Sequence, residues 1–394
     1  MVKKLQRKIM LYILLTMLII SPFMPTIKAK PTNIRRAKNI IITTSKTSSP
    51  SIGKAPREWT FMVYLDGDNN LESAAIDDFL EMSSIGSTAE VAIVALFDRW
   101  SNTSDPDDDT SYGDWTTAKI FYIDPGEEPY GSNADDDWGE RNMGDPSTLF
   151  DFINYSITNY PANKYILVLW DHGGGYEGVC WDEDNGDDNL KLDEIRQVLE
   201  NVYNSLGITI DIVGFDACLM GNIEVAYALR DYVDIVVFSQ EYEPGDGWPY
   251  DSILDNVTTS PYIAPRDMAS TIVDKYIYYY GNIYIEENAT MSAVNISYVV
   301  EHTYAAINRV VGYLLRYYTT YESDISYAVN SAEQFLYYWQ KDLKHFLSIL
   351  RSRVSNSELI ALLDDAINKV ENAIINYGHL SLHPNAYGLS AHIY

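Results

Sequence analysis

Runs of consecutive apolar residues recur through the first two thirds of the chain, at residues 59–65, 91–97, 165–170, 208–215 and 235–239. Such runs are typical of strands that are buried on both faces. Between them, apolar positions repeat at helical spacing over residues 71–82, 146–159, 192–206 and 223–229. Regular alternation of strand and helix predicts an α/β fold, with a mostly parallel sheet covered by helices.

The pattern is interrupted twice and then changes. Residues 98–115 and 124–145 are acidic, contain glycine and lack apolar periodicity, so we expect surface insertions there. After residue 256 helical spacing dominates, over residues 264–280, 303–318, 331–352 and 358–376, with a strand expected at 291–300. We therefore predict an α/β domain over residues 58–256, followed over residues 257–394 by a tyrosine-rich helical region that returns a strand at its end.

The N-terminus has the layout of a secretory signal. Basic residues precede an apolar run over residues 9–20, and a small-residue cleavage site lies near Ala29. We predict a signal peptide over residues 1–29, a linker or pro-segment over residues 30–57, and export. An uncleaved N-terminal anchor is the alternative, and it is the only route to the membrane that we expect.

The net charge of the chain argues against one class of partner, nucleic acids. The formal charge is −28, and residues 1–29 contain basic but no acidic side chains, so their removal makes the chain still more negative. A nucleic-acid backbone would be repelled by such a surface. We therefore expect no nucleic-acid partner.

A histidine and a cysteine each follow a predicted strand. The strand at 164–170 runs into His172, and the strand at 208–215 runs into Cys218. The carboxyl ends of parallel strands meet at one edge of a sheet, where ligands bind, and a single helix separates these two strands in the sequence. An imidazole and a thiol on neighbouring strand ends are the pair that nucleophilic catalysis needs. A helix start soon after Cys218 would also stabilise its thiolate.

Simpler interpretations of both residues exist. His172 could hydrogen-bond only its own loop, and Cys218 could be buried and inert. Cys180 is the only other cysteine, and a disulfide with Cys218 is the usual state of two cysteines in an exported protein.

Four ordered motifs resemble those of the clostripain family of cysteine peptidases, at residues 64–72, 170–176, 214–221 and 239–250. The resemblance covers about residues 59–250 and implies a caspase-like α/β/α sandwich, here with a C-terminal helical annex. It also implies a cysteine endopeptidase that acts on proteins or peptides through His172 and Cys218. No third catalytic residue is implied, so we expect Asp171 to be exposed or to cap its loop.

The resemblance further suggests how substrate is held. Backbone N–H groups of Gly173 and Cys218 would form the oxyanion hole, because a glycine lets the backbone approach closely. Family members typically cleave after Arg or Lys by means of acidic pocket residues. Asp216 matches one such position, and Asp246 is the candidate for the second. The alternative for Asp216 is a turn or helix-cap carboxylate.

The chemistry implied needs no cofactor, although relatives can depend on calcium. Asp66, Asp68, Asn70 and the acidic run at 182–188 offer the oxygen ligands that Ca²⁺ prefers, but their spacing does not fit an EF-hand and assigns no ligand set. Acidic surface loops also commonly bind nothing specific.

Two other functions compete with the peptidase. The first is a catalytically silent, secreted binding or adhesion protein with a Cys180–Cys218 disulfide, which thiol reactivity would reveal. The second is a metal-dependent hydrolase, which lacks the expected ligand spacing.

Overall fold

The computed structural model describes residues 56–101 and 107–394. The predicted signal peptide and almost all of the predicted linker lie outside these residues. Within the described part of the chain, no helix is long and apolar enough to cross a membrane.

The core of the fold is a nine-stranded sheet with the order β12-β10-β9-β8-β5-β1-β2-β3-β4. Its strands are β1 (Arg57–Gly67), β2 (Val91–Arg99), β3 (Lys119–Tyr122), β4 (Asp136–Asp137), β5 (Ala162–Trp170), β8 (Ile210–Asp216), β9 (Val233–Phe238), β10 (Thr290–Asn295) and β12 (Ile374–His379). The five central strands from β9 to β2 are parallel, and the strands at both edges are antiparallel. The predicted, mostly parallel sheet is confirmed.

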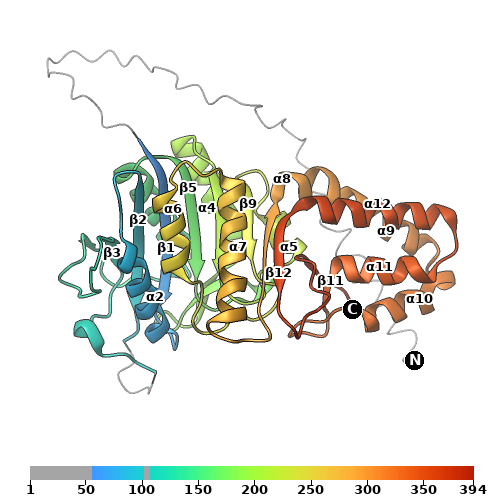
Figure 1. Cartoon of the computed structure of the whole chain (residues 1–394), viewed down its shortest axis with the longest axis horizontal. Coiled ribbons are helices and arrows are strands. Elements are labelled where there is room, and N and C mark those ends of the chain that lie inside the picture. The colour runs from blue at the N-terminus through green and yellow to red at the C-terminus, as the bar shows by residue number, and fades with distance from the viewer. Residues whose placement is uncertain (1–55, 102–106) are drawn as a thin grey trace, which may run out of the picture. The chain divides into compact units, whose positions relative to one another are not determined.

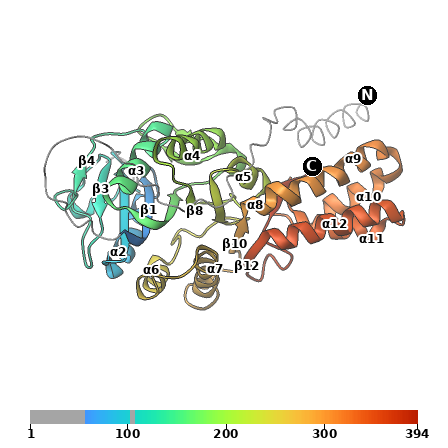
Figure 2. The ribbon, with the colours of Figure 1, turned by 90° about the horizontal axis from the view of Figure 1, so that it is seen from above.

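Helices cover both faces of this sheet (Figure 2). One face carries α2 (Glu72–Ile85), α6 (Tyr250–Thr259) and α7 (Pro265–Asn282), and the other carries α3 (Pro146–Asn159), α4 (Leu192–Leu206) and α5 (Ile223–Ala228). Every residue of β2 is buried, as expected for a strand between two helical layers. The predicted α/β/α sandwich is thus confirmed.

Local sequence signals explain where these helices begin. At α3, the side chain of Asp145 accepts a hydrogen bond from Ser147 N and proline occupies the first turn. On α4, the apolar residues at helical spacing, from Ile195 to Val202, face the core.

The C-terminal region contributes to the same sheet. Beyond β10 and β12, a group of helices packs together (Figure 1): α9 (Tyr304–Arg316), α10 (Tyr318–Ser331), α11 (Leu343–Arg353) and α12 (Ser357–Ala373). A short strand, β11 (Gln340–Asp342), pairs with β13 (Ser390–His392). The division at residue 256 stays a prediction.

Two predicted elements are wrong. The helix expected over 331–352 is broken, because residues 340–342 form β11 and Asp342 then caps α11 by accepting a hydrogen bond from His345 N. The strand expected over 291–300 ends at Asn295, whose side chain accepts from Tyr298 N and so starts α8 (Ile296–Tyr298) and the π-helical turn Val299–Thr303. In the first case the capping side chain starts a new helix after β11, and in the second it ends the expected strand.

Candidate active site

The predicted histidine and cysteine lie at the same edge of the sheet. Strands β5 and β8 are adjacent and parallel, with Trp170 opposite Asp216, and Asp171 N donates a hydrogen bond to Asp216 O at 3.2 Å. His172 and Cys218 follow directly on these two strands. The backbones stay in contact beyond the strand ends, because a Cβ added to Gly173 would lie 2.2 Å from Cys218 O.

Asn70 positions the histidine ring. Its Oδ1 lies 2.8 Å from His172 Nε2, so Nε2 carries the proton of the neutral ring and Nδ1 is left with a free lone pair. Burial lowers the pKa of His172 below its ordinary value of 6.5, which favours this neutral form. In the sequence Asn70 was considered only as a calcium ligand, although it belongs to the motif at residues 64–72.

Asp171 caps a loop and is not exposed. Its buried carboxylate accepts hydrogen bonds from Asn69 Nδ2, at 2.7 Å, and from Trp181 N. These contacts join the end of β5 to the turn after β1 and to β6 (Val179–Asp182), which forms a hairpin with β7 (Asp188–Leu190). Of the two expectations for Asp171, loop capping is confirmed and exposure is wrong.

The thiol of Cys218 lies against the backbone of Glu243. Glu243 N donates to Sγ at 3.4 Å, and Sγ lies 3.8 Å from Glu243 O. Burial raises the pKa of the thiol to about 11, although the Glu243 amide opposes the shift. The side chains of His172 and Cys218 are not hydrogen-bonded to each other. The resting pair is therefore a neutral thiol and a neutral imidazole.

The expected stabilisation of the thiolate by a helix start is wrong for this structure. Helix α5 begins only at Ile223, and the side chain of Asn222 accepts from Val225 N to cap it. Cys218 lies in the turn before it, where Leu219 has a φ of 67°. The field of a helix end fades within about one turn, so burial dominates the pKa of Cys218.

Cys180 does not pair with Cys218. Both cysteines are free, and the buried Cys180 Sγ lies 3.9 Å from Trp170 O. The disulfide on which the silent binding protein would depend is not formed. Both thiols lie in the described part of the chain.

Asp216 is a buried carboxylate beneath the cysteine, and not a turn or helix cap. Its Oδ2 accepts from Trp248 N at 3.1 Å and from Tyr250 OH at 2.9 Å. Burial raises its pKa to about 7, against the effect of these donors. Asp216 and the loop at 244–250 therefore form one unit.

Two further carboxylates near Asp216 were missed from the sequence. Glu243 lies beside Asp216, and burial together with that negative neighbour raises its pKa well above the ordinary value. Asp78, on α2, is also buried and accepts from Trp170 Nε1 at 2.6 Å. The motif at 239–250 included Glu243, but nothing in its spacing showed that the side chain turns inward.

Asp246 is exposed at the rim of this acidic region. Its Oδ2 accepts from Tyr279 OH at 3.1 Å. The next residue, Gly247, packs against Asp216, since a Cβ added there would lie 3.2 Å from Asp216 Oδ2. The two predicted pocket residues thus belong to one region, with Asp216 inside and Asp246 outside.

Gly173 gives a direct test of this geometry. Gly173→Ala would place a methyl group against backbone atoms of Cys218 that cannot move aside, so we expect a loss of about 1–3 kcal/mol in the free energy of unfolding. Peptidase activity should fall with it, because the turn holding Cys218 must shift. Gly245→Ala is the matched control, because its added Cβ meets no atom within 4 Å. Urea unfolding and a peptide-cleavage assay would measure both properties. If Gly173→Ala and Gly245→Ala had equal unfolding midpoints and equal activities, this packing would be contradicted.

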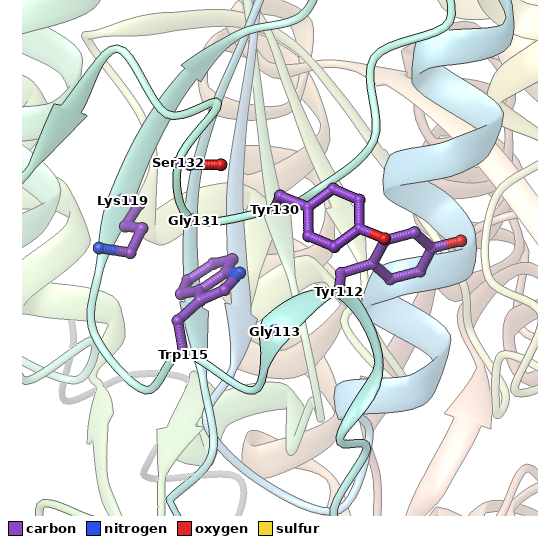
Figure 3. A pocket seen from close by; sticks show the side chains of 7 residues that line it. All are labelled: Tyr112, Gly113, Trp115, Lys119, Tyr130, Gly131 and Ser132. Atoms are coloured by element: carbon purple, nitrogen blue, oxygen red, sulfur yellow. The ribbon is translucent and has the colours of Figure 1, made fainter.

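A separate pocket lies on the predicted insertions (Figure 3). It is lined by Tyr112, Gly113, Trp115, Lys119, Tyr130, Gly131 and Ser132. The rings of Tyr112 and Tyr130 meet edge to face with centroids 5.3 Å apart. None of the predicted site residues lines it.

Comparison with known proteins agrees with the site. A family model described as the clostripain family matches residues 63–379. Clostripain of Hathewaya histolytica is 29% identical over 255 residues, which are 59% of this chain and 47% of that protein. The chain thus spans about half the length of this curated relative.

Solved structures share the fold. A secreted C11 cysteine protease from Bacteroides thetaiotaomicron, in complex with an irreversible peptide inhibitor, has a TM-score of 0.63 at 19% identity, covering 86% of this chain and 93% of its own. An inactive zymogen C11 protease from Parabacteroides distasonis has a TM-score of 0.61 at 19% identity, covering 88% and 94%. Because the family model matches most of the chain, this protein belongs to the clostripain family of cysteine peptidases.

Proposed function

We propose that this chain is a secreted cysteine endopeptidase that cleaves peptide bonds after Arg or Lys, with Cys218 as nucleophile and His172 as its proton-transfer partner. The observation that carries the proposal is the juxtaposition of the two residues on neighbouring strand ends, with Gly173 packed on the backbone of Cys218. Proteins or peptides are the substrates of such an enzyme.

Proton transfer follows from the resting state of the pair. The thiol is neutral, so Cys218 must lose its proton as Sγ attacks the peptide carbonyl carbon. Nδ1 of His172 holds the free lone pair and takes up that proton, while Asn70 fixes the other nitrogen. The same proton then passes to the leaving amine, and water hydrolyses the thioester with His172 again as base.

Two backbone N–H groups support the oxyanion role expected of them. Neither Gly173 N nor Cys218 N donates a backbone hydrogen bond among the described residues. A Cβ built on Gly173 would lie 2.9 Å from Cys218 N, so the two segments are close. Donors held in place before the reaction stabilise the charge that develops on the carbonyl oxygen.

The acidic region supports a preference for cationic side chains. Asp216 and the carboxylate of the half-buried Glu243 are buried beside Cys218, and Asp246 lies at the rim. A guanidinium or ammonium group would neutralise carboxylates that are otherwise costly to bury, through charge-assisted hydrogen bonds. The charge pattern of residues 1–29 and the secreted relative support export.

The test compares the chain lacking residues 1–29 with its Cys218→Ala variant on fluorogenic peptides that carry Arg, Lys, Leu or Asp at the cleaved position, with reductant present. We expect cleavage after Arg and Lys only, and none by the variant. Cys180→Ala is the matched control and should retain activity, because the buried thiol of Cys180 contacts Trp170 O and the substitution leaves the backbone hydrogen bond from Cys180 N to His172 O in place. Cleavage that survives in Cys218→Ala would refute the proposed nucleophile, and equal rates on all four peptides would refute the specificity.

A further inference from the structure

Three consecutive large apolar residues, Ile283, Tyr284 and Ile285, lie on the surface in the segment between α7 and β10. They are 64%, 48% and 69% exposed. Leu382, whose N–H donates to Glu287 O in the same segment, is 57% exposed. Single exposed apolar residues are ordinary, but a continuous run of them is typical of a binding surface. We call residues 283–285 the apolar loop.

The apolar loop is held rigidly on the end of α7. Ile283 N and Tyr284 N both donate to Tyr279 O, at 2.8 and 3.0 Å. Just after the loop, Glu286 N donates to Tyr280 O at 3.0 Å. The ring of Tyr284 stacks on that of Tyr279, with centroids 6.4 Å apart and planes 6° apart, and meets the ring of Tyr280 edge to face. A surface fixed in this way loses little conformational entropy when a ligand binds.

The two tyrosines that hold the apolar loop also hold the rim of the acidic region beside Cys218. Tyr279 OH donates to Asp246 Oδ2 at 3.1 Å, and Tyr280 OH donates to Gly247 O at 2.6 Å. Gly247 in turn packs against the carboxylate of Asp216. The apolar loop is therefore continuous with the proposed pocket for Arg or Lys.

The order of the strands places the apolar loop on one side of the reacting residues. In the order β10-β9-β8-β5, Cys218 follows β8 and His172 follows β5, while β9 and β10 lie on the other side of β8. Because β10 is antiparallel to β9, the loop before β10 lies at the same edge of the sheet as Cys218. His172 must lie beside the amine that leaves, so the acyl half of a substrate extends away from it, toward the apolar loop.

We propose that the apolar loop, with Leu382 beside it, binds a large apolar side chain of the substrate that lies N-terminal to the cleaved bond. The inference rests on the proposed function and adds a second determinant of the substrate to Arg or Lys. The substrate is then a polypeptide segment in which a residue such as Leu precedes the basic residue by a few positions. Removal of that side chain from water supplies the added affinity.

The first measurement compares kcat/KM for Arg peptides that carry Leu or Ala at each of the three positions before Arg. We expect a preference for Leu at one or more of them of about 5–20-fold, the effect of partly burying three additional carbon atoms. Replacing both exposed isoleucines, by Ile283→Ser with Ile285→Ser, should reduce this ratio to less than about twofold. Tyr262→Ser is the matched control and should keep the ratio, because it removes an exposed apolar side chain before the start of α7, at the far end of that helix.

Calorimetry distinguishes failure of this subsite from failure of the proposed function. The chain carrying Cys218→Ala is titrated with the same Leu and Ala peptides, so binding is measured whether or not the parent cleaves them. We expect the best Leu peptide to bind about 5–20-fold more tightly than the Ala peptide, and the two serine changes to abolish the difference. If the parent cleaves nothing while this difference is found, the subsite stands and only the proposed activity fails.

Two results would overturn the subsite. One is equal binding of the Leu and Ala peptides, or a difference that survives the two serine changes. The other is a dimer in sedimentation that the serine changes dissociate, without any preference for Leu, since the apolar loop would then bind a second copy of the chain.

Discussion

His172→Ala is expected to lower kcat/KM for an Arg peptide by about 10²–10⁴-fold, the usual contribution of a general acid and base. The effect should be large because burial raises the pKa of Cys218 to about 11, so at neutral pH almost no thiolate exists without help. Activity of the parent should rise with pH through the lowered pKa of His172, since only the neutral imidazole accepts a proton. Steady-state kinetics between pH 5 and 8 would measure both effects. The residual activity of the variant should climb steadily with pH and show no plateau near the pKa of an imidazole, because it depends only on the small thiolate fraction.

Asn70→Ala is the control for this prediction, because it should have a smaller effect than removal of the imidazole. It removes one hydrogen bond to Nε2 and leaves the imidazole, so we expect a loss of about 1 kcal/mol, or roughly fivefold in rate.

Iodoacetamide alkylation of Cys218 adds a measurement that needs no substrate. The rate in the parent should climb about tenfold per pH unit across neutrality, because the thiol titrates far above it. A fully reactive thiol at pH 6 would contradict the neutral resting pair.

The sequence predicted the sheet and the edge that carries the candidate pair because both depend on local patterns. Continuous apolar runs marked the buried strands, and a histidine and a cysteine directly after two of them had to lie at one edge. The elements that were missed depend on distant partners. β12 exists because it pairs with β10, and β11 because it pairs with β13 at the end of the chain.

Side-chain direction limited the prediction of the site in the same way. Asn70 stands in an acidic turn where its oxygen suggested a metal ligand, and only the fold shows it against His172. Glu243 lies in a recognised motif, but its inward turn follows from the loop that also supplies the backbone contact to Cys218.

Asp216→Asn is expected to lower kcat/KM for Arg and Lys peptides by about 10–150-fold, which corresponds to the 1.5–3 kcal/mol of a hydrogen bond to a charged group. The asparagine oxygen can still accept from Trp248 N and Tyr250 OH, so the pocket should keep its shape and lose its charge. The preference of the parent for Arg should also weaken as pH falls below about 7, because Asp216 becomes protonated there. The variant should show no such pH dependence.

Stability measurements separate this loss of charge from unfolding. The folded-state pKa of Asp216 is raised from 3.8 to about 7, so the folded protein binds the extra proton more tightly than the unfolded chain does. Asp216 therefore makes the parent less stable as pH rises from about 4 to 7, and Asp216→Asn should remove that loss and unfold no earlier than the parent at neutral pH. Asp246→Asn changes the same charge at the exposed rim and should reduce Arg cleavage much less. If Asp216→Asn instead kept the full ratio of Arg to Leu cleavage while remaining folded, the cation would be recognised elsewhere, with Glu243 as the next carboxylate to replace.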